Sequence, residues 1–191
     1  MAEFIHLNKT KETSLKFDKA GQYVVFMHDM SGKFTFELAH SKVEVDIYGL
    51  FTGNNSDQFT IETIQHHTAP GAVSNLFIKG VFDDKSRFNY QGLIRIEKSG
   101  QQSHAYQKNQ NLILSPHTFV ESKPYLEILA NDVFCTHGST TGKLNEEQLF
   151  YLKSRGISQE IAQKALVDGF IQEILEKITA KVPDVKTETL L

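Results

Sequence analysis

The chain has 191 residues, of which 20 are Lys or Arg and 23 are Asp or Glu, so its formal net charge is -3. This balance lacks the basic excess that binding to a phosphate backbone requires, and we expect no nucleic acid partner. One Cys excludes an internal disulfide framework, and no apolar run suits a membrane span or a signal peptide, so we expect one main domain, no membrane partner and a cytoplasmic location.

From about Leu15 to Cys135, short runs alternate between apolar and polar residues and are broken by Gly, Asn, Asp and Ser. None has the length or spacing of a helix, which predicts an all-β region. A glycine precedes an apolar pair in three segments: Ile47–Phe51, Ile78–Phe82 and Tyr90–Ile94. Because a glycine inside a strand marks a bulge or close approach, its recurrence favours stacked rungs over a sandwich. We predict a β-solenoid core with an N-terminal β segment over residues 1–142.

The composition becomes helical after this region. Asn145 is followed by two glutamates and a glutamine, which is typical of a capped helix start, and Gly156 is placed to end that helix. Ser158 is placed to cap a second helix, whose apolar residues step by three to five positions. We therefore predict a helical appendage over 143–180 and a flexible tail over 181–191.

Six motifs occur in order along the chain. They are H-H-T-A-P-G-A-V-S-N (66–75), K-G-V-F (79–82), A-Y-Q-K-N-Q-N-L-I-L (105–114), S-K-P-Y-L-E-I (122–128), C-T-H-G (135–138) and L-F-Y-L-K-S-R-G-I (149–157). Together they resemble the SufB/SufD family of iron-sulfur cluster assembly components, and the C-x-H-G form is more similar to the SufD branch. The resemblance implies a right-handed parallel β-helix followed by two C-terminal α-helices.

The resemblance also implies a function and partners. It implies a scaffold subunit of a Suf-type complex, with an ABC-type ATPase called SufC docked on the C-terminal helices. A SufB or SufD protomer, or a second copy of this chain, is implied to pair near the Cys/His strand and form a dimer. Family members carry a longer N-terminal segment, and Ser103-His104 and Asn131 depart from frequent family residues, so a short or divergent member is implied.

Cys135 and His137 form the candidate site for metal and cofactor binding. They are two positions apart in a β-type run, so both side chains point to the same side. Thiolate is the ligand that iron-sulfur clusters prefer, and imidazole can replace it on iron. Since a cluster normally needs four ligands, a second subunit must supply the rest. We expect an intersubunit pocket that receives sulfur or a transient iron-sulfur cluster.

The G-S-T-T-G-K segment from Gly138 to Lys143 is similar to a phosphate-binding loop. Its glycines enclose three residues instead of four, and Leu144 stands where a magnesium-binding Ser or Thr is required. We predict a turn that positions the following helix, and no nucleotide bound by this chain.

Phe150, Tyr151 and Arg155 are the candidates for docking the ATPase partner. Aromatic residues beside an Arg are typical of protein-binding hot spots, and Tyr151 and Arg155 are four positions apart, on one helical face. For Phe150, packing onto the end of the solenoid is an equal alternative.

Two other functions stay open. One is a structural protein-interaction module, a truncated paralogue without cluster chemistry. The other is a small metal-dependent enzyme that uses His66, His67 or His104. No Ser/His/Asp order, paired carboxylates or flavin motif is evident in the sequence, so we expect no enzymatic activity.

Overall fold

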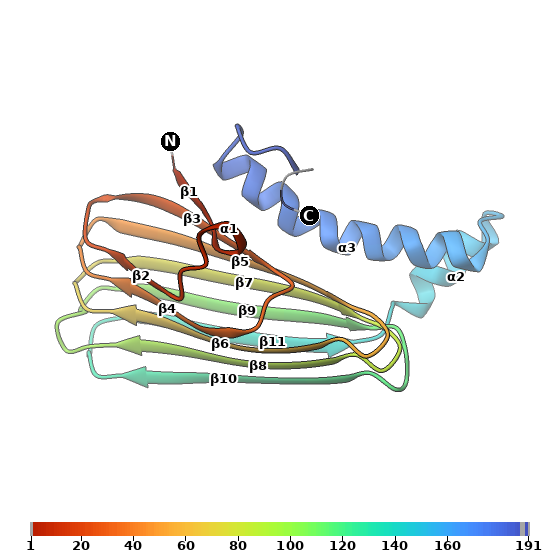
Figure 1. Cartoon of the computed structure of the whole chain (residues 1–191), viewed down its shortest axis with the longest axis horizontal. Coiled ribbons are helices and arrows are strands. Elements are labelled where there is room, and N and C mark those ends of the chain that lie inside the picture. Colours follow the sequence, from red (N-terminus) through yellow and green to blue (C-terminus); the bar gives the residue numbers. More distant parts are fainter. Residues whose placement is uncertain (1, 188–189, 191) are drawn as a thin grey trace.

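The structure is a computed structural model that describes residues 2–187 and 190. Its strands are β1 (Glu3–His6), β2 (Ser14–Phe17), β3 (Gly21–His28), β4 (Gly32–Leu38), β5 (Val43–Gly53), β6 (Gln58–His67), β7 (Val73–Phe82), β8 (Arg87–Ile96), β9 (His104–Ile113), β10 (Phe119–Ile128) and β11 (Phe134–Gly142). Its helices are α1 (Leu7–Thr10), α2 (Glu146–Ser154) and α3 (Gln159–Lys181), as Figure 1 shows.

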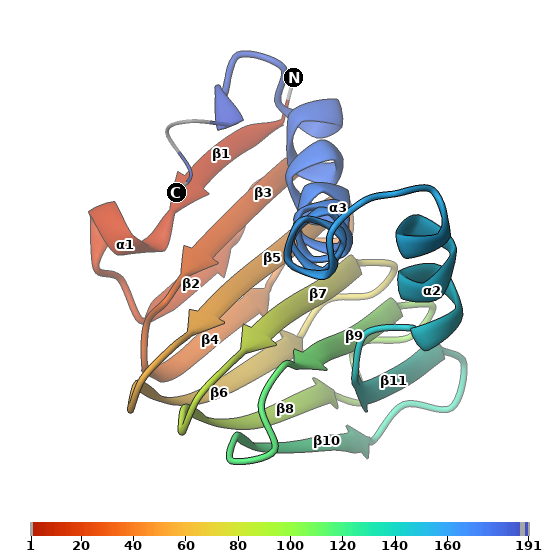
Figure 2. The same cartoon turned by 90° about the vertical axis from the view of Figure 1, so that its right-hand side faces the viewer.

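The strands form two facing parallel sheets. The odd-numbered strands lie in the order β1-β3-β5-β7-β9-β11, and the even-numbered strands in the order β2-β4-β6-β8-β10. The chain therefore passes from one sheet to the other with each successive strand, and every rung lies directly on the one before it (Figures 1 and 2). This arrangement is a parallel β-helix followed by two C-terminal helices, which confirms the predicted fold class.

The space between the sheets is filled differently along the solenoid. In the early rungs the inward residues are apolar, as for Phe34 and Phe36 on β4 and Ile47 on β5, all of which are buried. The alternation of strand side chains places every second residue in this core. From β6 onward polar residues join apolar core residues such as Phe88 and Ile94. The buried polar residues of this part are Thr63, Gln65, His67, Ser74, Gln107, Asn109 and Asn111.

The buried polar residues bond mainly to one another. The Gln65 amide donates to Ser74 Oγ at 2.7 Å, and His67 Nε2 lies 2.8 Å from the same oxygen. Asn111 donates through Nδ2 to Asn109 Oδ1 at 2.7 Å and to Thr141 Oγ1 at 3.2 Å. Separation of the later rungs would leave these buried groups without partners, at a cost of about 1 to 3 kcal/mol for each group. The bonds therefore hold the later rungs together.

The recurrent glycines mark close approaches within stacked rungs, as expected, but they do not lie at equivalent positions of those rungs. Gly80 pairs with Phe51 on β5, two residues beyond Gly49, and Gly92 lies in the other sheet, opposite Thr63. A Cβ on Gly80 would overlap the ring of Phe82, and one on Gly92 would overlap the Tyr90 hydroxyl. Each glycine makes room for a different interior side chain.

The predicted turn from Gly138 to Lys143 is wrong. Residues up to Gly142 continue β11, with Gly138 opposite Lys108 and Gly142 opposite Leu112 on β9. Ladder bonds to β9 and side-chain bonds, such as Ser139 Oγ to Ser122 Oγ at 2.9 Å, hold this Ser/Thr/Gly segment extended. Tertiary pairing thus overrides a composition that is typical of turns.

Both C-terminal helices begin at the predicted caps. Asn145 accepts a hydrogen bond from the Gln148 amide at 3.0 Å, and Ser158 accepts one from the Ile161 amide at 3.4 Å. Gly156, which follows α2, adopts a positive φ of 85° that suits glycine. Within the described residues, none of the helices combines the length and apolar character needed to cross a membrane.

The second half of α3 packs on the outer face of the odd-numbered sheet (Figure 2). Ile174 and Ile178 bury against an apolar cluster that includes Phe26, Tyr48 and Leu50. In the segment expected to be a flexible tail, Val182, Val185 and Leu190 join the same cluster, while residues 188, 189 and 191 lie outside the described residues.

Substitution of Gly80 by Ala should destabilise the solenoid. The added methyl group would overlap the Phe82 ring and the Asn111 carboxamide, so we expect a loss of about 2 kcal/mol in the free energy of unfolding. Urea unfolding followed by circular dichroism measures it. Gly142→Ala is the matched control, because nothing lies within 4 Å of its added Cβ. Equal stability of the two variants would contradict the packing described here.

His67 should make the protein sensitive to acid. Burial lowers the pKa of His67 to about 4, whereas the unfolded value is about 6.5. As the pH falls, the unfolded chain thus takes up the proton before the folded chain does. The contribution of neutral His67 to the free energy of unfolding is therefore fully present above pH 6.5 and is lost as the pH falls toward 4. His67→Gln should reduce the loss over this interval by up to roughly 3 kcal/mol in urea unfolding. The exposed His117→Gln should leave it unchanged, and a wild-type slope in His67→Gln would refute the assignment.

Candidate functional site

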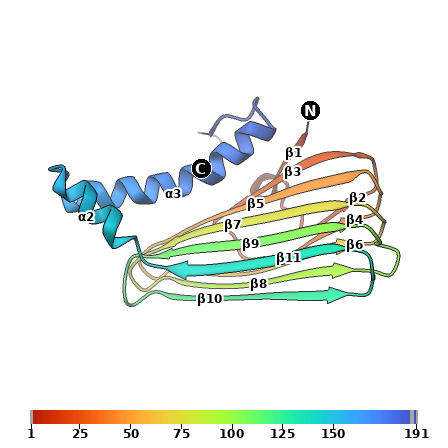
Figure 3. The ribbon, with the colours of Figure 1, turned by 180° about the vertical axis from the view of Figure 1, so that it is seen from behind.

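The solenoid ends in an uncovered rung, which we call the open end, formed by β10 and β11. Among the described residues, each of these strands is the last of its sheet and pairs with a single neighbour (Figure 3). The interior of this rung is therefore accessible. Leu126 pairs with the fully buried Ile94 and faces the same side, yet its side chain is 43% exposed.

Cys135 and His137 lie on β11 at this end. Cys135 is opposite Ala105 and His137 is opposite Gln107 on β9, and both β9 residues are buried in the interior. Strand alternation therefore directs both side chains inward, to one side of the strand, as the sequence predicted. The Cys135 side chain is half-buried against an apolar cluster that includes Ile96, whereas His137 is exposed.

The surroundings of Cys135 favour the neutral thiol. Burial raises the pKa of the Cys135 thiol to about 11, so the sulfur is protonated at neutral pH in the isolated chain. A cysteine must lose its proton to bind metal, and the metal itself can drive that loss. Within residues 2–187 and 190, no group of three His, Cys, Asp or Glu side chains could hold a metal ion. Cys135 and His137 by themselves are therefore fewer than the four ligands that a cluster normally needs.

The free edge of β11 presents an uninterrupted row of backbone hydrogen-bonding groups, whereas a proline interrupts the free edge of β10. The Phe134 amide donates to Ser103, on the β9 side, so the alternate residues Cys135, His137, Ser139 and Thr141 direct their backbone groups to the free edge. In β10 the Leu129 amide donates toward β8, which places Pro124 on the free edge. Because proline has no N–H, the edge of β11 is the better acceptor of another strand.

Apolar side chains surround the open end. Phe134 is 62% exposed, and Tyr125, Leu126 and Leu129 are exposed as well. An exposed apolar group of this kind beside an unpaired strand edge is typical of a protein interface. The geometry can therefore place Cys135 and His137 in a seam between two polypeptides.

The three candidate docking residues lie on or just after α2. Phe150 is 73% exposed, so the alternative that it packs onto the end of the solenoid is wrong. The Arg155 guanidinium lies 5.3 Å from the centre of the Tyr151 ring, and Nη2 donates to its hydroxyl at 3.3 Å. The structure thus brings Tyr151 and Arg155 together on an exposed face, as their spacing predicted.

The three histidines considered for an enzyme are not brought together. His66 lies on the outer face of β6, with Nε2 3.0 Å from Glu97, while His67 faces the interior. His104 lies on the other sheet, next to the exposed ring of Phe134. A metal centre made of these histidines has no support in this arrangement.

Sequence reasoning missed the buried polar atoms of Gln65, His67 and Gln107 in the interior next to the site. Gln65 Oε1, His67 Nδ1 and Gln107 Oε1 are buried atoms without a hydrogen-bond partner among the described residues. Gln107 is the residue opposite His137. The recurrence of polar residues at alternate strand positions could have indicated this feature. Alternation by itself, however, does not specify whether such residues face the interior or the solvent.

Residues 12–170 match the family described as "SUF system FeS cluster assembly, SufBD core domain". The chain is 39% identical over 100 residues to the iron-sulfur cluster assembly protein SufD of Escherichia coli strain K12, covering 52% of this chain and 24% of that protein. An iron-sulfur cluster assembly SufBD family protein of Synechocystis is 33% identical over 123 residues, covering 64% and 26%. Protein ABCI7, chloroplastic, of Arabidopsis thaliana is 42% identical over 88 residues, covering 46% and 18%. The chain thus spans about a quarter or less of the length of these curated relatives.

Proposed function

Because the chain belongs to the SufB/SufD family, as its motifs predicted, we propose that it is a scaffold subunit for iron-sulfur cluster assembly. The observation that carries this proposal is the open end, where Cys135 and His137 face inward beside an unpaired strand edge. The chain acts by holding ligands and partners, and contributes no catalytic residues of its own.

In the proposed complex a SufB- or SufD-like protomer, or a second copy of the chain, adds to the edge of β11. A two-fold pairing would place a second set of ligands opposite Cys135 and His137, which brings the number to the four that a cluster needs. The pairing surface also covers Phe134 and its exposed apolar neighbours. The cluster is the cargo of this seam, formed there and passed on.

A SufC-like ABC ATPase is the proposed second partner. Its nucleotide chemistry complements a chain in which we expect no nucleotide site, and its docking surface is the exposed face that carries Phe150, Tyr151 and Arg155. An Arg stacked near an aromatic ring is preorganised for binding, because less side-chain entropy is lost on contact.

A structural interaction module without cluster chemistry is the second candidate. It is favoured by the apolar packing that raises the pKa of the Cys135 thiol, since a buried thiol of this kind also serves as a small core residue. Such a module would pair through the edge of β11 and dock through α2, and it would bind no metal.

Substitution of the proposed ligands should abolish iron binding in the paired complex. We expect anaerobic reconstitution with iron and sulfide to load the complex of this chain with its SufB-like partner, and Cys135→Ser or His137→Ala to lower the bound iron at least tenfold. Thr141→Ala, also inward-facing on β11, should retain it. Iron and acid-labile sulfide are measured after gel filtration. Cys135→Ser that binds as much iron as wild type removes the cluster proposal, and pairing without iron identifies the interaction module.

Arg155→Ala should weaken docking of the ATPase. Loss of the guanidinium from a hot spot typically costs 2 kcal/mol or more, so we expect the dissociation constant for the SufC-like ATPase to rise about 30-fold. Calorimetric titration of the purified proteins measures it. Lys164→Ala removes an exposed cation from the neighbouring helix and serves as the control. Unchanged affinity in Arg155→Ala would mean that this face is not the docking surface.

A further inference from the structure

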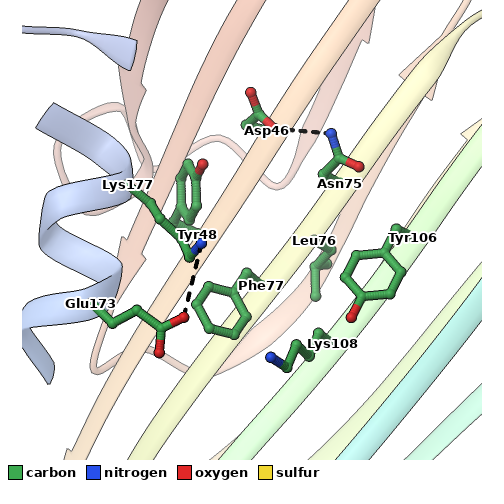
Figure 4. Close-up of a pocket in the computed structure, with 9 residues that line it drawn as sticks. All are labelled: Asp46, Tyr48, Asn75, Leu76, Phe77, Tyr106, Lys108, Glu173 and Lys177. Atoms are coloured by element: carbon green, nitrogen blue, oxygen red, sulfur yellow. Dashed lines mark hydrogen bonds and ion pairs between the residues drawn. The ribbon is translucent and has the colours of Figure 1, made fainter. Parts of the chain in front are cut away.

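A cavity of about 360 Å³ lies between α3 and the outer face of β5, β7 and β9 (Figure 4). Its volume is within the range of roughly 300 to 1,000 Å³ that is usual for sites of small molecules. The rings of Tyr48, Phe77 and Tyr106 line it from the sheet, and Glu173 and Lys177 close it from the helix. It opens on the outer face of the sheet, on β9 next to β11, whereas Cys135 and His137 of β11 point to the interior.

Cations converge on the ring of Phe77. The ammonium groups of Lys79, Lys108 and Lys177 lie 5.5, 5.2 and 5.7 Å from its centre. Lys79 is buried and donates to the Phe170 carbonyl at 2.6 Å and to the Glu173 carboxylate. Lys177 lies 3.8 Å from that same carboxylate, so Glu173 serves two of the three cations.

Lys108 makes no close ion pair with a described residue, although the charge of the Glu173 carboxylate acts on it from farther away. Among residues 2–187 and 190, no Asp or Glu oxygen lies within 4 Å of its ammonium group. The other acidic group at the cavity, Asp46, is already held by Lys181 at 2.9 Å and by Asn75 at 3.0 Å. The cavity therefore has an excess of positive charge on the side of β9, next to a nearly buried aromatic ring.

The neighbouring cations also repel one another. Burial lowers the pKa of Lys79, and the charges of Lys108 and Lys177 lower it further, although Glu173 opposes the shift. A ring quadrupole attracts each nearby cation only weakly, by about 0.5 to 1 kcal/mol at exposed sites. A negatively charged ligand between Lys108 and Lys177 would relieve this repulsion more strongly than the ring does.

We propose that the cavity binds a small organic anion with a flat apolar body. Its carboxylate or phosphate lies between Lys108 of β9 and Lys177 of α3, and its body packs against Phe77 and Tyr106. Such a ligand bridges the sheet and the helix. It would thereby fix α3 on the solenoid from a position that the metal ligands do not occupy.

Calorimetric titration of the isolated chain tests this proposal with phenyl phosphate, benzoate and inorganic phosphate as probes. We expect saturable 1:1 binding of at least one aromatic probe, weakened at least tenfold by Lys108→Gln and unchanged in Lys98→Gln, an exposed lysine in the connection between β8 and β9 that does not line the cavity. Tyr106→Ala should weaken the aromatic probes and leave inorganic phosphate unaffected. A rise in the melting temperature of wild type with the bound probe is the second measurement.

Failure of both aromatic probes to saturate, or equal binding by wild type and Lys108→Gln, would overturn the site. Inorganic phosphate binding as tightly as phenyl phosphate would overturn the aromatic part of the assignment. The experiment needs neither iron nor the ATPase. Its outcome is therefore independent of the scaffold function proposed above.

Discussion

Backbone pairing between successive rungs is the interaction on which this molecule depends. In a parallel β-helix each strand bonds to the strand before and the strand after it in its own sheet, so every interior rung satisfies both of its edges. Within the part of the chain that the structure describes, the last rung has no successor, and β11 keeps one row of backbone donors and acceptors unpaired. The strand with this unpaired edge is also the strand that carries Cys135 and His137. The proposed pairing and the proposed ligands thus depend on the same surface.

The composition of the interior changes toward this end of the solenoid. Aromatic and aliphatic residues fill the early rungs, while hydroxyl, carboxamide and imidazole groups join such residues in the interior from β6 onward. Polar contacts such as that between Asn111 and Thr141 reach β11 itself. A wholly apolar last rung at an accessible end would be a site for nonspecific aggregation, whereas directional bonds favour one partner geometry.

The fold could be predicted from the sequence because strand alternation, helix caps and family motifs all indicated the same architecture. The caps at Asn145 and Ser158 are local signals, and the structure contains both. The segment after Gly138 could not be assigned correctly, because Ser, Thr and Gly are typical of turns and only the long-range pairing with β9 holds them extended. For the candidate site, two-residue spacing predicted that Cys135 and His137 share a side. The burial of the thiol and the position of Pro124 on the free edge depend on three-dimensional register, which spacing does not specify.

The way α3 is held has a mechanical consequence. Its buried residues beyond the midpoint pack on the sheet, while Ile161 near its start is 62% exposed, and Gly169 lies between the two halves. The eleven residues from Gln159 to Gly169 extend about 16 Å at 1.5 Å per residue. A swing of roughly 10° about that glycine would displace the tip, and with it α2, by about 3 Å. A small rotation of α3 at Gly169 would therefore become a larger displacement at its start, next to α2, which the short segment after Gly142 joins to β11.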